Sequence, residues 1–189
     1  VVDKLLDGEG IISYDIRARE IGRNSTYYKK PANYNVYKYS ANNGTEYFIC
    51  YESFDKKALF GFIRLRIVNK KENMTEFDVL KGKGLVRELH VYGETTAVNS
   101  YKNDAAQHRG IGGGLLKLAE KITKQHNLYG ITVIAGDGVR GYYEEKHGYE
   151  DVETFMVKYF NFLEVWFEIF VYYFKYLFNF VIIHKLKQA

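Results

Sequence analysis

Several short stretches of mainly apolar residues lie between polar and turn-forming segments, which is the pattern of β-strands. The stretches cover residues 46–53, 58–68 and 84–92, and they are rich in aromatic and β-branched side chains. A short polar connection, residues 54–57, joins the first two, so we expect an antiparallel hairpin there. Residues 131–135 are apolar throughout, as in a strand buried on both faces.

Apolar residues recur at helical spacing in two further places. The first predicted helix covers residues 115–126 and has one apolar face, made of Leu115, Leu118, Ala119 and Ile122. The second covers residues 139–147 and ends before Gly148. Residues 155–157 then complete the sheet. This order of strands and helices predicts an α/β fold with a mixed sheet.

The first 45 residues carry weaker signals. Residues 11–19 are predicted to form a strand. The polar, Asn- and Tyr-rich residues 24–45 carry no readable motif, and their clearest feature is a turn at 42–44 (NNG). A second polar segment without a readable motif covers residues 93–106.

A glycine-rich turn, residues 107–114 (QHRGIGGG), precedes the first predicted helix. Glycines let the backbone approach a ligand without a Cβ in the way. The unpaired N–H groups and the positive dipole at the start of a helix favour an anion, so a pyrophosphate is the expected occupant, with Arg109 as a further contact. The pattern is neither a P-loop nor the dinucleotide-binding fingerprint, and a turn without a ligand is the alternative.

Length and composition fit one globular domain and a tail. The chain has 189 residues, of which 47% are hydrophobic and 26% are charged. It begins with Val1 rather than Met, so we expect a piece of a longer protein. Cys50 is the only cysteine, which excludes an internal disulfide and a cysteine-built metal site, and no metal site is expected. Because Cys50 lies in a predicted strand, we expect a buried thiol.

The net charge of +4 is unevenly distributed along the chain. Basic residues outnumber acidic ones in residues 17–38 and again in residues 55–71. Such segments form a phosphate-facing patch in nucleic-acid-binding proteins, but an ordinary solvated surface has the same composition.

The form Gln/Arg-x-x-Gly-x-Gly/Ala before a helix resembles the pyrophosphate loop of the GNAT acetyltransferase superfamily. The resemblance implies a mixed, mostly antiparallel sheet flanked by helices, and acetyl-coenzyme A as the cofactor. In that fold the strand before the loop splays from its neighbour, and its free backbone groups pair with the pantetheine arm. Residues 87–91 form this strand here. The second helix of the fold supplies a tyrosine near the thioester sulfur, the place of Tyr142 and Tyr143.

Longer strings resemble the catalytic subunit of Elongator. They are IRARE (16–20), GFIRLR (61–66), VRELHVYG (86–93), QHRGIG (107–112), GVRGYY (138–143) and MVK (156–158). The resemblance starts near residue 10, and we expect residues 1–158 to be one GNAT-type domain. The chain departs from the family at Arg109, where Gln is usual, at Ile111, where an aromatic residue is usual, and at Gly141, where Asn is usual.

The resemblance also implies a two-part enzyme. An upstream radical S-adenosylmethionine half carries a 4Fe-4S cluster, and its cysteines lie outside this chain. Together with the acetyl-coenzyme A-binding half it converts the wobble uridine of tRNA to 5-carboxymethyl derivatives. The expected partners are therefore tRNA and other Elongator subunits. Two other functions stay open, which are lysine acetylation of a protein such as a histone and a non-catalytic module that holds acetyl-coenzyme A.

Particular residues take roles from this resemblance. The expected contacts to acetyl-coenzyme A are Glu88, Leu89, His90, Val91, Gln107, Arg109, Gly110, Ile111, Gly112, Gly113, Tyr142 and Tyr143. Tyr142 is expected to protonate or hold the departing thiolate, because the ordinary tyrosine pKa of about 10 suits an acid. Expected contacts to tRNA phosphates are Arg17, Arg19, Lys29 and Lys30.

The predicted strand 84–92 carries the candidate base. Strict alternation places Glu88 and His90 on one face with Val86, and Arg87 on the other. Either Glu88 or His90 is a candidate general base if an amine is acetylated. The structural alternative for His90 is a histidine that is hydrogen-bonded and has no catalytic role. The structural alternative for Leu89, Val91 and Tyr143 is packing in the core.

Residues 160–183 form an aromatic and apolar stretch beyond the usual end of the family. On a helical wheel its polar residues fall on one stripe, which contains Asn161, Glu164, Glu168, Lys175 and Asn179. A helix of that length spans a bilayer, so residues 159–189 are predicted to anchor a cytoplasmic protein on an organelle membrane, such as the mitochondrial outer membrane. The alternatives are an amphipathic helix that docks on another subunit, and translated AT-rich noncoding sequence.

Overall fold

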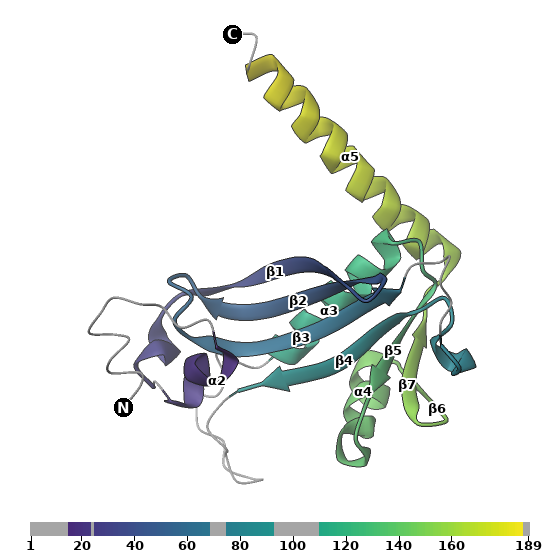
Figure 1. The fold of residues 1–189 in the computed structure, drawn as a ribbon, viewed down its shortest axis with the longest axis horizontal. Helices are drawn as coiled ribbons and strands as arrows, with labels where there is room; N and C mark the ends of the chain where they lie inside the picture. The colour runs from purple at the N-terminus through teal and green to yellow at the C-terminus, as the bar shows by residue number, and fades with distance from the viewer. Residues whose placement is uncertain (1–14, 24, 69–74, 93–109, 187–189) are drawn as a thin grey trace.

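The computed structural model describes residues 15–23, 25–68, 75–92 and 110–186, which form one sheet with helices packed on it and a long helix that projects away (Figure 1). The α-helices are α2 (Ile16–Arg19), α3 (Ile111–Gln125), α4 (Arg140–His147) and α5 (Phe162–Leu186). The strands are β1 (Ala32–Ala41), β2 (Gly44–Ser53), β3 (Leu59–Val68), β4 (Gly84–Val91), β5 (Gly130–Ile134), β6 (Glu150–Val152) and β7 (Phe155–Tyr159). Short 3-10 helices are η1 (Ile21–Arg23), η2 (Ser25–Lys29), η3 (Asp78–Leu80) and η5 (Asp137–Val139).

The seven strands form one mixed sheet in the order β1-β2-β3-β4-β5-β7-β6. Neighbouring strands are antiparallel, except that β4 and β5 run parallel. The connection between these two contains α3, because parallel neighbours need a crossover. The predicted mixed, mostly antiparallel sheet flanked by helices is therefore confirmed, as is the hairpin of β2 and β3.

Helix α3 packs on one face of the sheet through the apolar side that its sequence predicted. Leu115 and Ala119 are fully buried, and Leu118 and Ile122 pack against the same core. Tyr143 of α4 belongs to this cluster of buried side chains too. Helices α3 and α4 therefore contribute to the same hydrophobic core.

The N-terminal segment differs from the prediction in two places. The described part of the predicted strand 11–19 forms α2, because Oδ1 of Asp15 accepts a hydrogen bond from the Ala18 N–H at 3.1 Å and so caps a helix. The Asn- and Tyr-rich stretch contains β1, which was not predicted. Most residues of this edge strand are exposed, and Asn, Lys and Ser interrupt its tyrosines, so the stretch resembles a polar loop in sequence. The predicted turn is present, with Asn42 and Asn43 at positive φ.

The predicted helix of the tail is confirmed as α5, but its assignment as a membrane anchor is not supported. Glu164 Oε2 lies 3.2 Å from Lys124 Nζ, and Glu168 Oε2 lies 3.6 Å from Lys121 Nζ. Val165 between them is fully buried. Two acidic residues placed inside the membrane by the prediction therefore pair with lysines of α3. Among the described residues, no helix is both long and apolar enough to cross a membrane.

Candidate functional site

Strand β4 contains a β-bulge at the centre of the predicted site. Arg64 of β3 lies opposite Glu88, and the next residue of β3 lies opposite Val86, so Arg87 is the extra residue. Val86 is buried in the core shared with α3, whereas Arg87 Nη1 lies 3.4 Å from Glu46 Oε1 and Glu88 accepts a 2.7 Å hydrogen bond from Arg64. The strict alternation predicted for this strand is therefore wrong, because Arg87 and Glu88 both face away from that core.

Strands β4 and β5 diverge after their first residues (Figure 1). Their parallel pairing ends with Val86 opposite Val133. From Glu88 to Val91, β4 pairs with β3, and no described strand pairs with the other edge of residues 87–91. This is the splay expected from the resemblance. It leaves backbone N–H and C=O groups that an extended ligand can bind as an added strand.

Helix α3 begins at this free edge. Its N-cap, Gly110, has a left-handed φ of +100° and no side-chain capping hydrogen bond. The first intrahelical bond joins the Gly114 N–H to the Gly110 carbonyl at 2.8 Å, so the N–H groups of residues 111–113 have no partner within the helix. These groups can hold an anion. The predicted contacts Gln107 and Arg109 lie outside the described residues.

Tyr142 of α4 reaches the same place. A Cβ built on Gly112 would lie 2.9 Å from the Tyr142 hydroxyl and 3.4 Å from Val91 Cγ2. The end of β4 and the Tyr142 hydroxyl therefore both border Gly112 in the first turn of α3. Burial raises the pKa of Tyr142 above its ordinary value, so its hydroxyl keeps its proton at neutral pH.

Tyr143 has a different environment. Its side chain is buried, and its ring packs edge-on against Tyr149 with centroids 5.7 Å apart. Burial, and then the neighbouring Tyr142, raise the pKa of Tyr143 to about 12. The structure thus places Tyr143 in the core, which is the packing alternative for this residue.

Glu88 and His90 lie side by side on the sheet face that points away from α3. His90 Nε2 is 3.4 Å from Glu88 Oε2, and the His90 ring stacks on Phe62 with centroids 5.2 Å apart. Leu89 packs on the opposite face, against the core shared with α3. The two candidate bases therefore share a face, as predicted, but Tyr142 packs against the other one.

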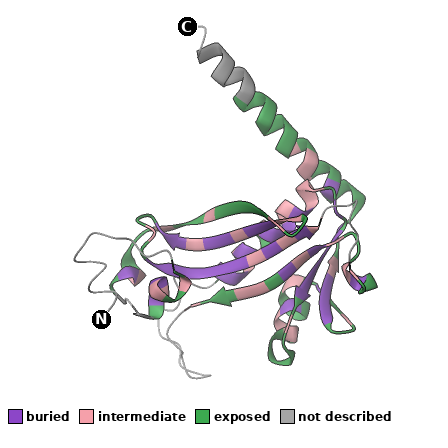
Figure 2. Cartoon of the chain, in the orientation of Figure 1, coloured by how far each residue is buried: buried purple, intermediate pink, exposed green. Residues whose placement is uncertain are grey.

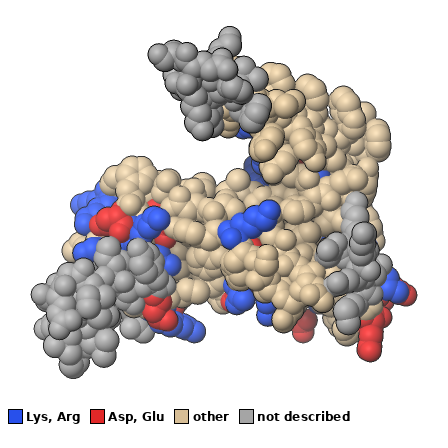
Figure 3. All heavy atoms as spheres, turned by 45° about the horizontal axis from the view of Figure 1, so that its top comes forward, with Lys and Arg blue, Asp and Glu red and all other residues tan. Residues whose placement is uncertain are grey.

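The residues predicted to contact tRNA phosphates differ in accessibility. Arg19 is buried, and its Nη1 donates a 2.7 Å hydrogen bond to Glu52 Oε2, so it holds α2 on the sheet and is not available to a phosphate. Arg17, Lys29 and Lys30 are all exposed, and the Lys30 ammonium lies over the Tyr27 ring. On the face seen in Figure 3, the Lys and Arg side chains are scattered, several of them beside Asp or Glu.

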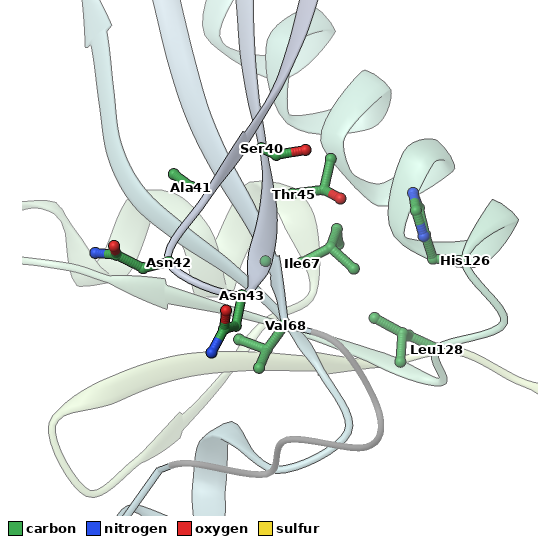
Figure 4. A pocket seen from close by; sticks show the side chains of 10 residues that line it. Ser40, Ala41, Asn42, Asn43, Thr45, Ile67, Val68, His126 and Leu128 are labelled. Atoms are coloured by element: carbon green, nitrogen blue, oxygen red, sulfur yellow. The ribbon is translucent and has the colours of Figure 1, made fainter.

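Two hollows lie away from the splayed edge. The larger, of about 660 Å³, opens at the other end of α3 between the β1–β2 turn and His126 (Figure 4). His126 bonds to the Tyr47 hydroxyl at 2.6 Å, and burial lowers its pKa. The smaller, of about 360 Å³, lies on the sheet face of Arg64 and is lined by Phe48 and Tyr39 among others. Neither was predicted, because each joins residues from distant parts of the sequence.

His147 is a further residue of the site that the sequence did not indicate. Its ring lies edge-on to Tyr142, with centroids 4.7 Å apart, and its Cε1 would lie 3.1 Å from a Cβ on Gly113. Burial lowers the pKa of His147. No motif or spacing marks this histidine, because its place depends on how α4 packs against α3.

Curated proteins with similar sequences share one name. The chain is 39% identical over 153 residues to Elongator complex protein 3 of Bos taurus, and 42% identical over 139 residues to that of Schizosaccharomyces pombe. These matches cover 79% and 71% of this chain, but 27% and 25% of the relatives. The chain thus spans about a quarter of their length. No family model matches it.

A solved structure shows a similar fold. An archaeal Elp3 of Methanocaldococcus infernus, with an N-terminal deletion of residues 1–46, matches with a TM-score of 0.67 at 32% sequence identity. The match covers 84% of this chain and 38% of the archaeal one. Together with the sequence identities, this similarity confirms the resemblance that the strings predicted.

Proposed function

We propose that this chain, which is homologous to part of Elongator complex protein 3, binds acetyl-coenzyme A at the splayed edge of its sheet. The N–H groups of Ile111, Gly112 and Gly113 bind the diphosphate, and the free edge of residues 87–91 binds the pantetheine arm. The observation that carries this proposal is the junction of three features. The pairing of β4 and β5 ends, α3 starts without a side-chain cap, and the Tyr142 hydroxyl and Val91 of β4 both border Gly112 of α3.

The residues present suit acyl transfer. Acetyl-coenzyme A supplies a thioester, whose C–S bond breaks when an acceptor takes the acetyl group. Tyr142 donates its proton to the departing sulfur, and its raised pKa keeps that proton in place until it is needed. The main-chain N–H groups at the start of α3 orient the bound diphosphate.

We propose tRNA as the acceptor that the full protein serves, in wobble-uridine modification to 5-carboxymethyl derivatives. The proposal follows from the homology and includes the upstream radical S-adenosylmethionine half and its 4Fe-4S cluster, which lie outside this chain. Other Elongator subunits are the proposed protein partners, because the relatives carry the name of that complex.

Lysine acetylation is the second candidate function. The observation that favours it is the Glu88 and His90 pair, since a half-exposed imidazole beside a carboxylate can take a proton from an amine. Acetyl-coenzyme A hydrolysis by the full-length protein, measured with and without tRNA, separates the two. Stimulation by tRNA supports the first function. Transfer of acetyl groups to a lysine peptide, unaffected by tRNA, supports the second.

Calorimetric titration of the 189-residue chain with acetyl-coenzyme A tests the binding site itself. Gly113→Glu places a carboxylate beside the diphosphate, and the built Cβ would meet only the edge of the His147 ring, at 3.1 Å. We expect the affinity to fall tenfold to a hundredfold, on the order of the 1.5–3 kcal/mol that hydrogen bonds to charged groups contribute. Gly22→Glu is the matched control, because nothing lies within 4 Å of its Cβ position. Equal affinities of the two variants would refute the assignment.

A further inference from the structure

Helix α5 carries a continuous apolar surface on the side that points away from the domain. Val165 is fully buried and Ile169 packs against the core, so these residues mark the side that faces the domain. Beyond its first turns the helix is exposed as far as residue 179 (Figure 2). The side opposite Val165 presents large apolar side chains that are each more than half exposed. We call them the α5 seam: Leu163, Trp166, Phe167, Phe170, Phe174, Leu177 and Phe178.

The spacing of the α5 seam is that of a helix–helix contact. Its members follow one another mainly at intervals of three and four residues, like the apolar positions of a coiled coil. Four of its rings stack in succession along the helix, with centroid distances of 5.8, 6.1 and 6.4 Å, from Trp166 through Phe170 and Phe174 to Phe178. Because neighbouring rings already restrict one another, less side-chain freedom is lost when a partner binds.

The α5 seam is large enough to bind a partner by itself. Aromatic side chains present about 150–250 Å² each, so five that are more than half exposed, with two leucines, offer several hundred Å². Monomeric proteins rarely expose larger continuous apolar patches. A standard interface buries roughly 800 Å² per partner, which is within reach of the seam and its borders.

As far as residue 179, the charged residues of the helix lie outside the α5 seam. Glu164 and Glu168 face α3 and pair with Lys124 and Lys121. Lys175 falls on the same polar stripe of the helical wheel. A contact between two seams therefore buries none of these three charges, which removes the main penalty against pairing two identical surfaces. A uniformly apolar stripe is also complementary to itself, as a two-fold interface requires.

We propose that the α5 seam binds the same seam of a second copy of this chain, in an antiparallel pair of helices. The helix has 25 residues and is about 37 Å long, so it extends well beyond the domain at its start. An antiparallel arrangement places the two domains at opposite ends of the pair, where they do not collide. This dimer is independent of the proposed binding of acetyl-coenzyme A.

The mass of the 189-residue chain in solution, measured by sedimentation equilibrium, tests the dimer. We expect twice the chain mass of 22.1 kDa at micromolar concentration. The double variant Phe170→Glu, Phe174→Glu should sediment as a monomer, because carboxylates in the contact repel one another. Tyr176→Glu is the matched control. It changes a side chain that is 65% exposed and lies on the other side of the helix, so this variant should stay dimeric.

Circular dichroism and thermal unfolding test whether each variant is folded. We expect folded variants, because the three replaced side chains are exposed in the single chain. A native chain that is monomeric at these concentrations overturns the proposal, as does a dimer that the double variant leaves intact. Vesicles of phosphatidylcholine and phosphatidylserine provide the last arm. If the native chain sediments with them as a monomer and the double variant does not, a lipid surface occupies the seam, and the second copy is refuted.

Discussion

The hydroxyl of Tyr142 lies 2.9 Å from the point where a Cβ on Gly112 would stand. Tyr142 belongs to α4 and Gly112 to the first turn of α3, so the absence of a side chain on Gly112 lets the two helices meet. Val91 of β4 borders the same point, with its Cγ2 at 3.4 Å. This arrangement brings together the protonated hydroxyl of Tyr142, N–H groups that have no partner within α3, and an edge of β4 that no described strand pairs with.

Gly112→Ala is predicted to destabilise the fold through this contact. The added methyl group overlaps the Tyr142 hydroxyl, and overpacking costs about 1–3 kcal/mol, partly offset by the higher helix propensity of Ala. In the Tyr142→Phe background the nearest atoms would be Val91 Cγ2 at 3.4 Å and the ring carbon Cζ at 3.9 Å. The same alanine should then cost little. Urea unfolding of the four proteins measures this coupling, and an equal cost in both backgrounds would show that the hydroxyl is not the obstacle.

Tyr142→Phe is predicted to separate binding from catalysis. The ring still packs against α3, so calorimetry should give an unchanged affinity for acetyl-coenzyme A. The rate of acyl transfer should fall by about 10²–10⁴-fold, the range for loss of a general acid. Because burial raises the pKa of Tyr142, the native rate should not decline through loss of this proton until the pH is above 10. A decline near neutral pH that is absent in Tyr142→Phe would contradict this role.

Much of the sheet could be predicted because its central strands are rich in buried apolar residues. Strands β2, β3 and β5 carry runs of aromatic and β-branched residues, α3 carries apolar residues at helical spacing, and these elements appear where expected. Strand β1 could not be found this way, since it lies at the edge of the sheet and is largely exposed. The bulge at Arg87 was also hidden, because a strand with one extra residue reads like one without it.

The candidate site was predicted in outline but not in its side-chain arrangement. The glycine-rich turn marked the start of α3, since an uncapped helix start is a local property of the chain. The resemblance gave Tyr142 the role of the acid and left core packing open for Tyr143. In the structure the Tyr142 hydroxyl lies beside Gly112, whereas the Tyr143 ring packs against Tyr149 in the core. Arg19 was predicted to be an exposed cation, because its buried partner Glu52 is distant from it in the sequence.

Arg19→Ala is predicted to destabilise the protein by about 3–5 kcal/mol, because it leaves the buried carboxylate of Glu52 without its ion pair. Adding Glu52→Gln removes that charge and should restore part of the loss. Urea unfolding at neutral pH measures the stability of the single and the double variant. If Arg19→Ala instead weakened RNA binding and left stability unchanged, the structural role of Arg19 would be wrong.

Glu52 is also predicted to contribute to acid unfolding. Burial raises its pKa, but hydrogen bonds from Tyr37, Asn35 and Arg19 outweigh burial and leave the pKa below its ordinary value. A lowered pKa in the folded state means that Glu52 stabilises the fold fully above its unfolded pKa, about 4.3, and less as the pH falls further. Stability measured from pH 6 to pH 3 should therefore decline less steeply in Glu52→Gln than in the native chain.

Val165→Asp is predicted to release α5 from the domain without unfolding the sheet. Val165 is fully buried between α5 and the core, so a carboxylate there loses its hydration without gaining a partner. The flanking pair of Glu164 and Lys124 is partly exposed and contributes about 0–1 kcal/mol, so Glu164→Gln is the control that should change little. Hydrogen exchange followed by mass spectrometry should show faster exchange along α5 in Val165→Asp, with the amides of α3 and β3 still protected. Equal loss of protection in the sheet would mean that α5 folds as one unit with the domain, and the boundary predicted near residue 158 would then have no physical basis.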